Sequence, residues 1–377
     1  MTQGHGSHER EPAGYREAGV DYETLDAGKR LAMAAALSTS PLLAAHGARP
    51  LDASRGEPAF VFELDGRALA FVVEGLGTKS IVARQVLAEQ GIDRFADVAY
   101  DTVAAIVNDL CCVGALPLVV NAYFATGSSE WYREGDARSR SLVEGWRRAC
   151  ADAGCAWGGG ESPSLSGLVD EREIELAGAA VGAVPDGHTP ILGQELSPGD
   201  EIVLVGSSGL HANGASLARL LASRLDDGYA TPLPSGTTLG EALLEPSAMY
   251  VGLVAQLLAR RIPLTYISHI TGHGLLKLMR RPQALRYRIW KLPETPEVLS
   301  FLVAEAGLDA KAAYSTFNMG AGYALYCAAG AGAEIVELAA QSGLRAWVAG
   351  GVEEGPREVV LEPINVRFDG SELELSA

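Results

Sequence analysis

Three acidic residues of the sequence lie where carboxylates could bind a divalent cation. Glu74 ends an apolar run, Asp109 lies within the most apolar predicted helix, and Glu161 follows three consecutive glycines. Burying a carboxylate without a partner is costly, and carboxylate oxygens are preferred ligands of Mg²⁺. We therefore expect the three carboxylates to bind one cation. In the alternative interpretation, Asp109 caps or pairs with a neighbouring element and Glu161 is exposed in a wide loop.

The segment that begins at Glu74 also places a lysine at a predicted strand-to-helix junction. A phosphate-binding P-loop needs glycine directly before the lysine, whereas Thr78 separates Gly77 from Lys79. What remains is a basic side chain at the start of a helix, where the helix dipole favours an anion. We predict that Lys79 contacts phosphate. The alternative is a solvated lysine in an ordinary strand–turn–helix connection.

A second glycine-rich segment, Gly206–Gly214, follows an apolar strand and precedes a helix. Small residues with one histidine and one asparagine at the end of a strand are typical of a ligand crevice. The nucleophile-elbow motif G-x-S-x-G does not fit, because it would need glycine in place of Leu210. We predict functional roles for His211 and Asn213, although a lone histidine is more often structural.

Two further glycine-rich segments follow later in the chain. His269–Gly274 again joins a strand to a helix, and its two histidines have no acid or cysteine close by, which makes it a weak zinc site. Backbone N–H groups at a helix start are better suited to phosphate. The segment Asn318–Gly322 begins just before the last buried strand. It either binds a ligand or only packs against neighbouring residues.

Hydrophobic periodicity predicts an α/β or α+β protein of two domains. Residues 1–14 are expected to form a disordered tail, and the domain boundary is expected at about Pro185–Gly199. Asp65–Gly66, a dipeptide favoured in tight turns, joins two β-rich runs into a hairpin. The expected strands are 59–64, 68–73, 116–124, 173–184, 201–205, 264–268, 322–327, 346–353 and 357–361. The expected helices are 24–37, 81–90, 97–113, 138–153, 213–222, 246–260, 274–280, 296–305 and 333–342.

Composition narrows the function further. The 377 residues carry a net charge of −17, which disfavours binding to nucleic acid. The charge does not exclude a phosphorylated small molecule as a ligand, because lysine, backbone N–H groups and cations offset the repulsion locally. No apolar run is long enough to span a membrane, and the N-terminus does not resemble a secretory signal. Five cysteines in irregular positions predict core thiols in a reducing cytoplasm.

The order of these motifs resembles the aminoimidazole ribonucleotide synthetase family, the phosphoribosylformylglycinamidine cyclo-ligases. The resemblance covers nearly all of residues 15–353. The matching segments are Tyr15–Asp21, Gly75–Lys79, Val107–Leu110, Gly114–Pro117, Ala125–Gly127, Gly159–Glu161, Gly206–Gly214, His269–Gly272, Phe317–Gly322 and Gly350–Val352.

The resemblance implies an ATP- and Mg²⁺-dependent homodimer that acts on a phosphoribosyl substrate. Residues 15–187 would form an ATP-binding mixed-sheet domain that builds a dimer barrel, and residues 188–377 an α/β sandwich. The implied ATP-binding residues are Glu74, Gly75, Gly77, Thr78, Lys79, Asn108, Asp109, Gly159, Gly160 and Glu161, with Glu74, Asp109 and Glu161 on the metal. The implied substrate-binding residues are Ser207, Ser208, Gly209, His211, His269, Thr271, Gly272, His273, Gly274 and Asn318. The implied catalytic residues are His211, Asn213 and Lys79.

The sequence departs from the family pattern at three places. Glu74 stands for an aspartate, His273 for a glycine in the expected phosphate loop, and Ser164 for a second acid after Glu161. These changes leave two alternatives open. One is a paralogue that uses ATP to phosphorylate another amide or phosphate-bearing substrate, and the other is a non-catalytic nucleotide-binding subunit.

Overall fold

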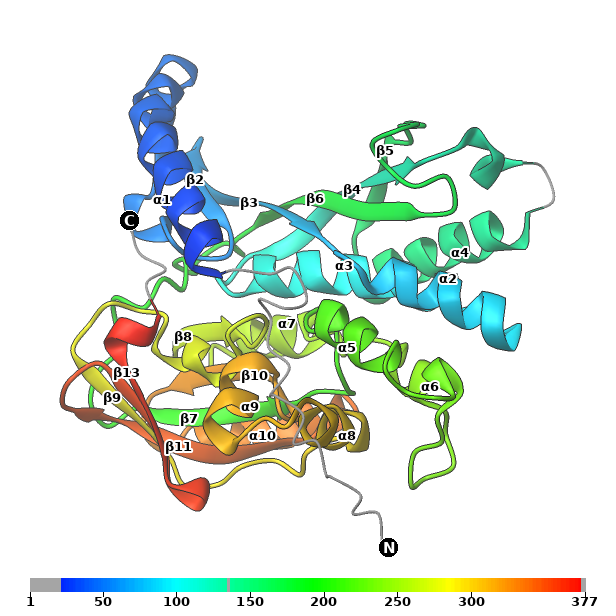
Figure 1. Cartoon of the computed structure of the whole chain (residues 1–377). Helices are drawn as coiled ribbons and strands as arrows, with labels where there is room; N and C mark the ends of the chain where they lie inside the picture. Colours follow the sequence, from blue (N-terminus) through cyan, green and yellow to red (C-terminus); the bar gives the residue numbers. More distant parts are fainter. Residues whose placement is uncertain (1–21, 134–135, 374–377) are drawn as a thin grey trace, which may run out of the picture.

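The computed structural model describes residues 22–133 and 136–373, arranged around two mixed β-sheets (Figure 1). The expected tail and the Tyr15–Asp21 motif lie outside the described residues. The first sheet has the strand order β1-β2-β3-β6-β4-β5. Its strands are β1 (Ala48–Pro50), β2 (Phe60–Leu64), β3 (Arg67–Gly75), β4 (Leu116–Thr126), β5 (Ala156–Glu161) and β6 (Ile174–Ala183).

Helices cover one face of this sheet (Figure 1). They are α2 (Lys79–Gln90), α3 (Phe95–Cys111) and α4 (Ala137–Asp152), while α1 (Tyr22–Thr39) precedes the sheet. The apolar residues of α3 recur at helical spacing, and most of them are buried. The predicted hairpin of β2 and β3 is confirmed, because Asp65 and Gly66 at its turn have φ of 51° and 76°. Positive φ at both positions is the geometry of a type I′ turn.

The second sheet has the order β13-β12-β9-β11-β7-β10-β8. Its strands are β7 (Glu201–Gly206), β8 (Leu264–His269), β9 (Leu285–Ile289), β10 (Ala321–Cys327), β11 (Ala346–Glu354), β12 (Glu358–Leu361) and β13 (Val366–Asp369). Its helices are α5 (Ala215–Ala222), α6 (Leu239–Leu243), α7 (Val251–Ala259), α8 (Glu297–Ala306), α9 (Ala310–Thr316) and α10 (Gly332–Gln341). The chain crosses from the first sheet to the second between Ala183 and Glu201.

Several predicted elements were wrong in type or extent. The glycine run before Glu161 is strand β5, which pairs in parallel with β4. A Cβ on Gly160 would lie 2.0 Å from the Ala122 carbonyl oxygen, so glycine permits this approach of the two strands. Helix α7 begins at Val251, five residues later than expected, and 274–279 is a 3₁₀ helix. Strands β9 and β13 and helix α9 were not predicted.

The two parts of the chain meet along α2 and α3, which lie between the first sheet and helices α5 and α7 (Figure 1). Strand β3 leads into α2, and β7 leads into α5, so both glycine-rich junctions reach this boundary. Within the described ranges, no helix has both the length and the apolar character needed to cross a membrane.

Candidate active site

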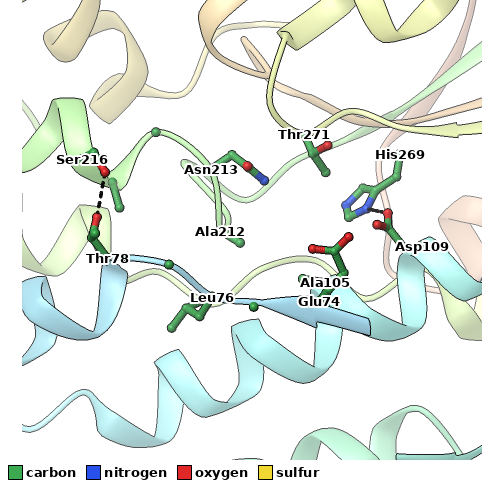
Figure 2. Close-up of a pocket in the computed structure, with 14 residues that line it drawn as sticks. Glu74, Leu76, Thr78, Ala105, Asp109, Ala212, Asn213, Ser216, His269 and Thr271 are labelled. Carbon is green, nitrogen blue, oxygen red and sulfur yellow. Dashed lines mark hydrogen bonds and ion pairs between the residues drawn. The ribbon is translucent and has the colours of Figure 1, made fainter. Parts of the chain in front are cut away.

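A pocket of about 250 Å³ opens at the boundary between the two parts (Figure 2). The N-terminal part contributes the end of β3, the start of α2 and one face of α3. The C-terminal part contributes the start of α5 and the segment after β8. The predicted site residues that line the pocket are Glu74, Gly75, Gly77, Thr78, Asp109, Asn213, His269 and Thr271.

Two carboxylates and a histidine form one end of the pocket (Figure 2). His269 Nδ1 lies 2.6 Å from Asp109 Oδ1. Burial, the charge of Asp109 and a hydrogen bond to it together raise the pKa of Glu74 to about 8, against the opposing charges of Lys277 and Arg280. A raised pKa on one of two adjacent carboxyls is expected where they share a proton.

The pKa of Asp109 moves in the opposite direction. Burial raises it, but the hydrogen bond and charge of His269, with help from Lys277 and Arg280, hold it below its usual range. Asp109 is therefore the ionised member of the pair and Glu74 the protonated one. Two carboxyl groups that line one pocket supply oxygen ligands of the kind that Mg²⁺ accepts, so the residues present fit this cation.

The N-termini of two helices form the other end of the pocket. Thr78 is the residue directly before α2, and Gly214 is the residue directly before α5. The hydroxyl oxygens of Thr78 and Ser216 are 3.0 Å apart and join the two helix starts across the domain boundary (Figure 2). Unpaired N–H groups and helix dipoles at such ends favour an anion such as phosphate. The pocket thus offers cation ligands at one end and anion-binding groups at the other.

A smaller inner pocket of about 10 Å³ adjoins the main one. Ala105, Ala212, Asn213, His269 and Thr271 line both pockets, and Asn108, His211 and Ser247 line the inner pocket alone. Burial, together with the neighbouring His269 and Lys79, lowers the pKa of His211 to about 3. His211 is therefore neutral in the folded protein near pH 7.

The Lys79 side chain is fully buried, outside the residues that line the main pocket. Its ammonium forms an ion pair with Asp101 and donates a hydrogen bond to the His211 carbonyl oxygen at 2.9 Å. The structure thus gives Lys79 a different partner from the phosphate predicted for it. The buried pair joins the start of α2 to α3 and to the loop that carries His211.

Asparagine side chains hold the loops around the inner pocket. Asn108 donates to the Ala248 carbonyl oxygen at 3.0 Å and accepts from the Tyr250 N–H at 2.9 Å. Asn318 Oδ1 is 2.8 Å from the Ser207 hydroxyl oxygen, and its Nδ2 donates to the Gly209 carbonyl oxygen at 2.8 Å. These contacts fix the segments before and after His211.

The single cage of three carboxylates predicted from the sequence is not formed within one chain. Glu161 lies on β5, three strand positions from β3, which at ~4.8 Å per strand places it about 14 Å away across the sheet. Its side chain is exposed and accepts a hydrogen bond from the Ser162 N–H. Gly159 and Gly160 lie on the same edge strand. Within residues 22–133 and 136–373, no group of three or more acids, histidines or cysteines is arranged to hold a metal.

The phosphate loop predicted at His269–Gly274 is only partly in the pocket. His269 and Thr271 line it, whereas Gly272, His273 and Gly274 do not. His273 has φ of 72°, a left-handed conformation that glycine adopts without strain. Ser208 also lies outside the pocket lining, and its hydroxyl donates to the Pro246 carbonyl oxygen at 2.6 Å.

Sequence reasoning missed several residues of this site. Ser216 continues the Gly206–Gly214 run into the first turn of α5, and extending that motif by two residues would have found it. Ser247 and Asp101 carry no local signal, because their roles depend on contacts between distant segments.

The fold is shared with solved structures of other two-domain proteins. The hydrogenase maturation protein HypE in complex with ATP has a TM-score of 0.57 at 16% identity, over 81% of this chain and 85% of that one. PurL of T. maritima complexed with FGAR has a TM-score of 0.57 at 17% identity, over 85% of this chain and 48% of that one. At these identities the likeness shows a common two-domain fold.

Sequence comparison assigns the chain to one family among the proteins that share this fold. The N-terminal domain model of AIR synthase related proteins matches residues 56–184, and the C-terminal domain model matches residues 197–362. The chain belongs to the AIR synthase related protein family. It is 35% identical to the phosphoribosylformylglycinamidine cyclo-ligase of Anaeromyxobacter sp. (strain Fw109-5), over 93% of this chain and 98% of the relative. It is 33% identical to the enzyme of that name from Methanothermobacter thermautotrophicus, over 81% and 86% of the two chains.

Proposed function

We propose that this chain is an ATP-dependent cyclo-ligase that converts formylglycinamidine ribonucleotide into aminoimidazole ribonucleotide, a reaction of purine biosynthesis. The observation that carries the proposal is the pairing, in one pocket, of the Glu74 and Asp109 carboxylates with the N-termini of α2 and α5. The names of relatives at 33–35% identity over most of the chain support it.

The chemistry suits such a pocket. An amide oxygen is a poor leaving group, so it is first activated by phosphorylation. The amide oxygen attacks the γ-phosphorus of ATP, an O–P bond forms, and ADP departs. An amidine nitrogen of the same substrate then attacks the activated carbon, the C–O bond breaks, and phosphate leaves with the former amide oxygen. The protein has to align the groups and neutralise charge.

Residue roles follow from where the side chains lie. Glu74 and Asp109 would hold Mg²⁺, which when bound neutralises phosphate charge. His269 orients Asp109 through their 2.6 Å contact. The helix starts at Thr78 and Gly214 would receive phosphate oxygens, and Asn213 and Thr271 face the space between the two ends (Figure 2).

We also propose that the protein is a homodimer paired through its first sheet. Apolar side chains are exposed on this sheet: Phe71 is 41% exposed, Val181 37% and Val119 37%. Phe71 pairs with Val181, and Val181 with Val119, so the three form one row across β3, β6 and β4. Contiguous exposed apolar surface of this kind marks an interaction site. All five cysteines are free thiols, which supports a place in the reducing cytoplasm.

The test is a coupled assay with purified protein, formylglycinamidine ribonucleotide, ATP and Mg²⁺. We expect ADP and aminoimidazole ribonucleotide to form in equal amounts. Folded protein that forms neither product under these conditions would refute the substrate assignment.

A second candidate is a paralogue that activates a different amide with ATP. The observation that favours it is His273, which places a side chain at a left-handed position where the family pattern has glycine. Complementation of a bacterium that lacks its cyclo-ligase separates the two. Growth without added purine supports the cyclo-ligase, and failure of a well-expressed protein supports the paralogue.

A further inference from the structure

The inner pocket contains two buried polar atoms that have no hydrogen-bond partner within the described part of the chain. They are Nδ1 of His211 and the hydroxyl oxygen of Ser247, and the two residues are 5% and 6% exposed. The two residues come from segments 36 positions apart in the sequence, yet both line the same small pocket. Because buried polar atoms are nearly always hydrogen-bonded, two unpartnered atoms on residues that line one pocket point to a polar group that binds there.

The partners of His211 define which ring nitrogen carries its proton. Nε2 accepts hydrogen bonds from the Ser208 N–H at 3.1 Å and the Ala248 N–H at 3.3 Å. A neutral imidazole that accepts at Nε2 carries its proton on Nδ1. The unpartnered nitrogen is therefore a hydrogen-bond donor, and its partner must present a lone pair.

Backbone contacts hold Ser247 in place, and its hydroxyl takes no part in them. The Ser247 N–H donates to Asp101 Oδ1 at 2.6 Å, and Asp101 is paired with Lys79. Asn108 binds the next residues of the loop at Ala248 and Tyr250. The hydroxyl thus remains available to a ligand, and a pocket of about 10 Å³ accommodates roughly one oxygen atom.

We propose that His211 and Ser247 form an inner subsite that binds one oxygen atom of a molecule bound in the main pocket. His211 donates from Nδ1, and the Ser247 hydroxyl makes the second hydrogen bond. The oxygen belongs either to the transferred phosphoryl group or to the amide that receives it, since both present lone pairs. Ser247 is thereby a substrate-contacting residue of the proposed cyclo-ligase, and the kinetic part of this inference rests on that function.

Substitution of Ser247 provides the kinetic test. Ser247→Ala removes the hydroxyl but keeps the backbone contact to Asp101, so we expect an unchanged unfolding temperature and a loss of about tenfold in kcat/KM. Ser247→Thr keeps the hydroxyl and should restore most of the activity. Ser223→Ala, at a serine whose hydroxyl donates to the Leu220 carbonyl oxygen on the surface, is the matched control. Wild-type kinetics for Ser247→Ala would overturn the proposal.

Nitrogen NMR of histidine-labelled protein tests the donor directly and needs no turnover. The chain has seven histidines, and the His211→Asn variant assigns the His211 signal. We expect the proton of His211 on Nδ1. We expect the Nδ1 signal to shift on addition of one of two probes, either Mg²⁺ with a non-hydrolysable ATP analogue or the amide substrate. The probe that causes the shift shows whether the bound oxygen belongs to the phosphoryl group or to the amide. A proton on Nε2, or no shift with either probe, would overturn the proposal. If the wild-type protein binds both probes without turnover, the proposed function is refuted. The Nδ1 signal of His211 still shows in that case whether the inner subsite binds an oxygen atom.

Discussion

The carboxylates of Glu74 and Asp109 have opposite protonation preferences although they lie side by side. Burial and Asp109 raise the Glu74 pKa to about 8, so the folded protein keeps a proton there at pH 7. A cation has to displace this proton, because it binds the ionised carboxylate. We expect the affinity for Mg²⁺–ATP to rise between pH 6 and pH 8, with release of up to about one proton at pH 7. Calorimetry in buffers of different ionisation enthalpy measures the released proton.

Two variants of Glu74 complete this experiment. Glu74→Gln removes the titrating group, so ATP binding should lose its Mg²⁺ dependence and release no proton. Glu74→Asp keeps the carboxylate one methylene shorter and should retain both. Proton release by Glu74→Gln equal to that of the wild type would contradict the assignment.

The neutral state of His211 has a consequence for stability. Burial lowers its pKa to about 3, whereas an unfolded histidine has a pKa near 6.5. Between these values the unfolded chain binds a proton that the folded protein does not, so acid favours unfolding. As the pH falls from 6.5 to 4, the free energy of unfolding should decrease by up to ~1.4 kcal/mol per pH unit more in the wild type than in His211→Asn. Denaturant unfolding measures this difference, and equal slopes would show that His211 titrates normally.

At the scale of elements, the buried Lys79–Asp101 pair fixes α2 against α3 and the loop after β7. Removing one partner leaves a buried charge unpaired, so we expect Lys79→Met to lower the free energy of unfolding by about 3–5 kcal/mol. The double variant Lys79→Met/Asp101→Asn should recover part of that loss. ATP affinity of the folded fraction should change less than tenfold. A stable Lys79→Met protein with a hundredfold weaker ATP affinity would instead place the ammonium on a phosphate.

The elements with a clear hydrophobic period were predictable from sequence, and those set by distant contacts were not. The hairpin of β2 and β3 follows from its alternation and its Asp65–Gly66 turn. The glycines of β5 have the sequence pattern of a loop, because they form a strand only through pairing with β4. The same limit explains the site. Glu74 and Asp109 were recognisable as acids beside apolar runs. The position of Glu161 away from their pocket depends on the strand order, which the sequence pattern does not specify.

At the scale of the whole molecule, the exposed row on the first sheet predicts association of two chains. A glutamate in this row would be buried without a partner in the dimer, so Phe71→Glu and Val181→Glu should yield monomers of 39.5 kDa. Trp290→Glu changes a residue that is 46% exposed on the C-terminal part and is the control. Light scattering after gel filtration gives the masses. Dimers in both sheet variants, or a monomeric wild type, would contradict this interface.

In the proposed reaction, ATP phosphorylates the substrate's amide oxygen in the pocket of Glu74 and Asp109. The most direct measurement follows that oxygen, using formylglycinamidine ribonucleotide labelled with oxygen-18 in its formyl group. We expect each aminoimidazole ribonucleotide formed to be accompanied by one phosphate that carries the label, and we expect the Glu74→Gln variant to form neither product. Label released into water, or labelled substrate left intact while ATP is hydrolysed, would contradict it.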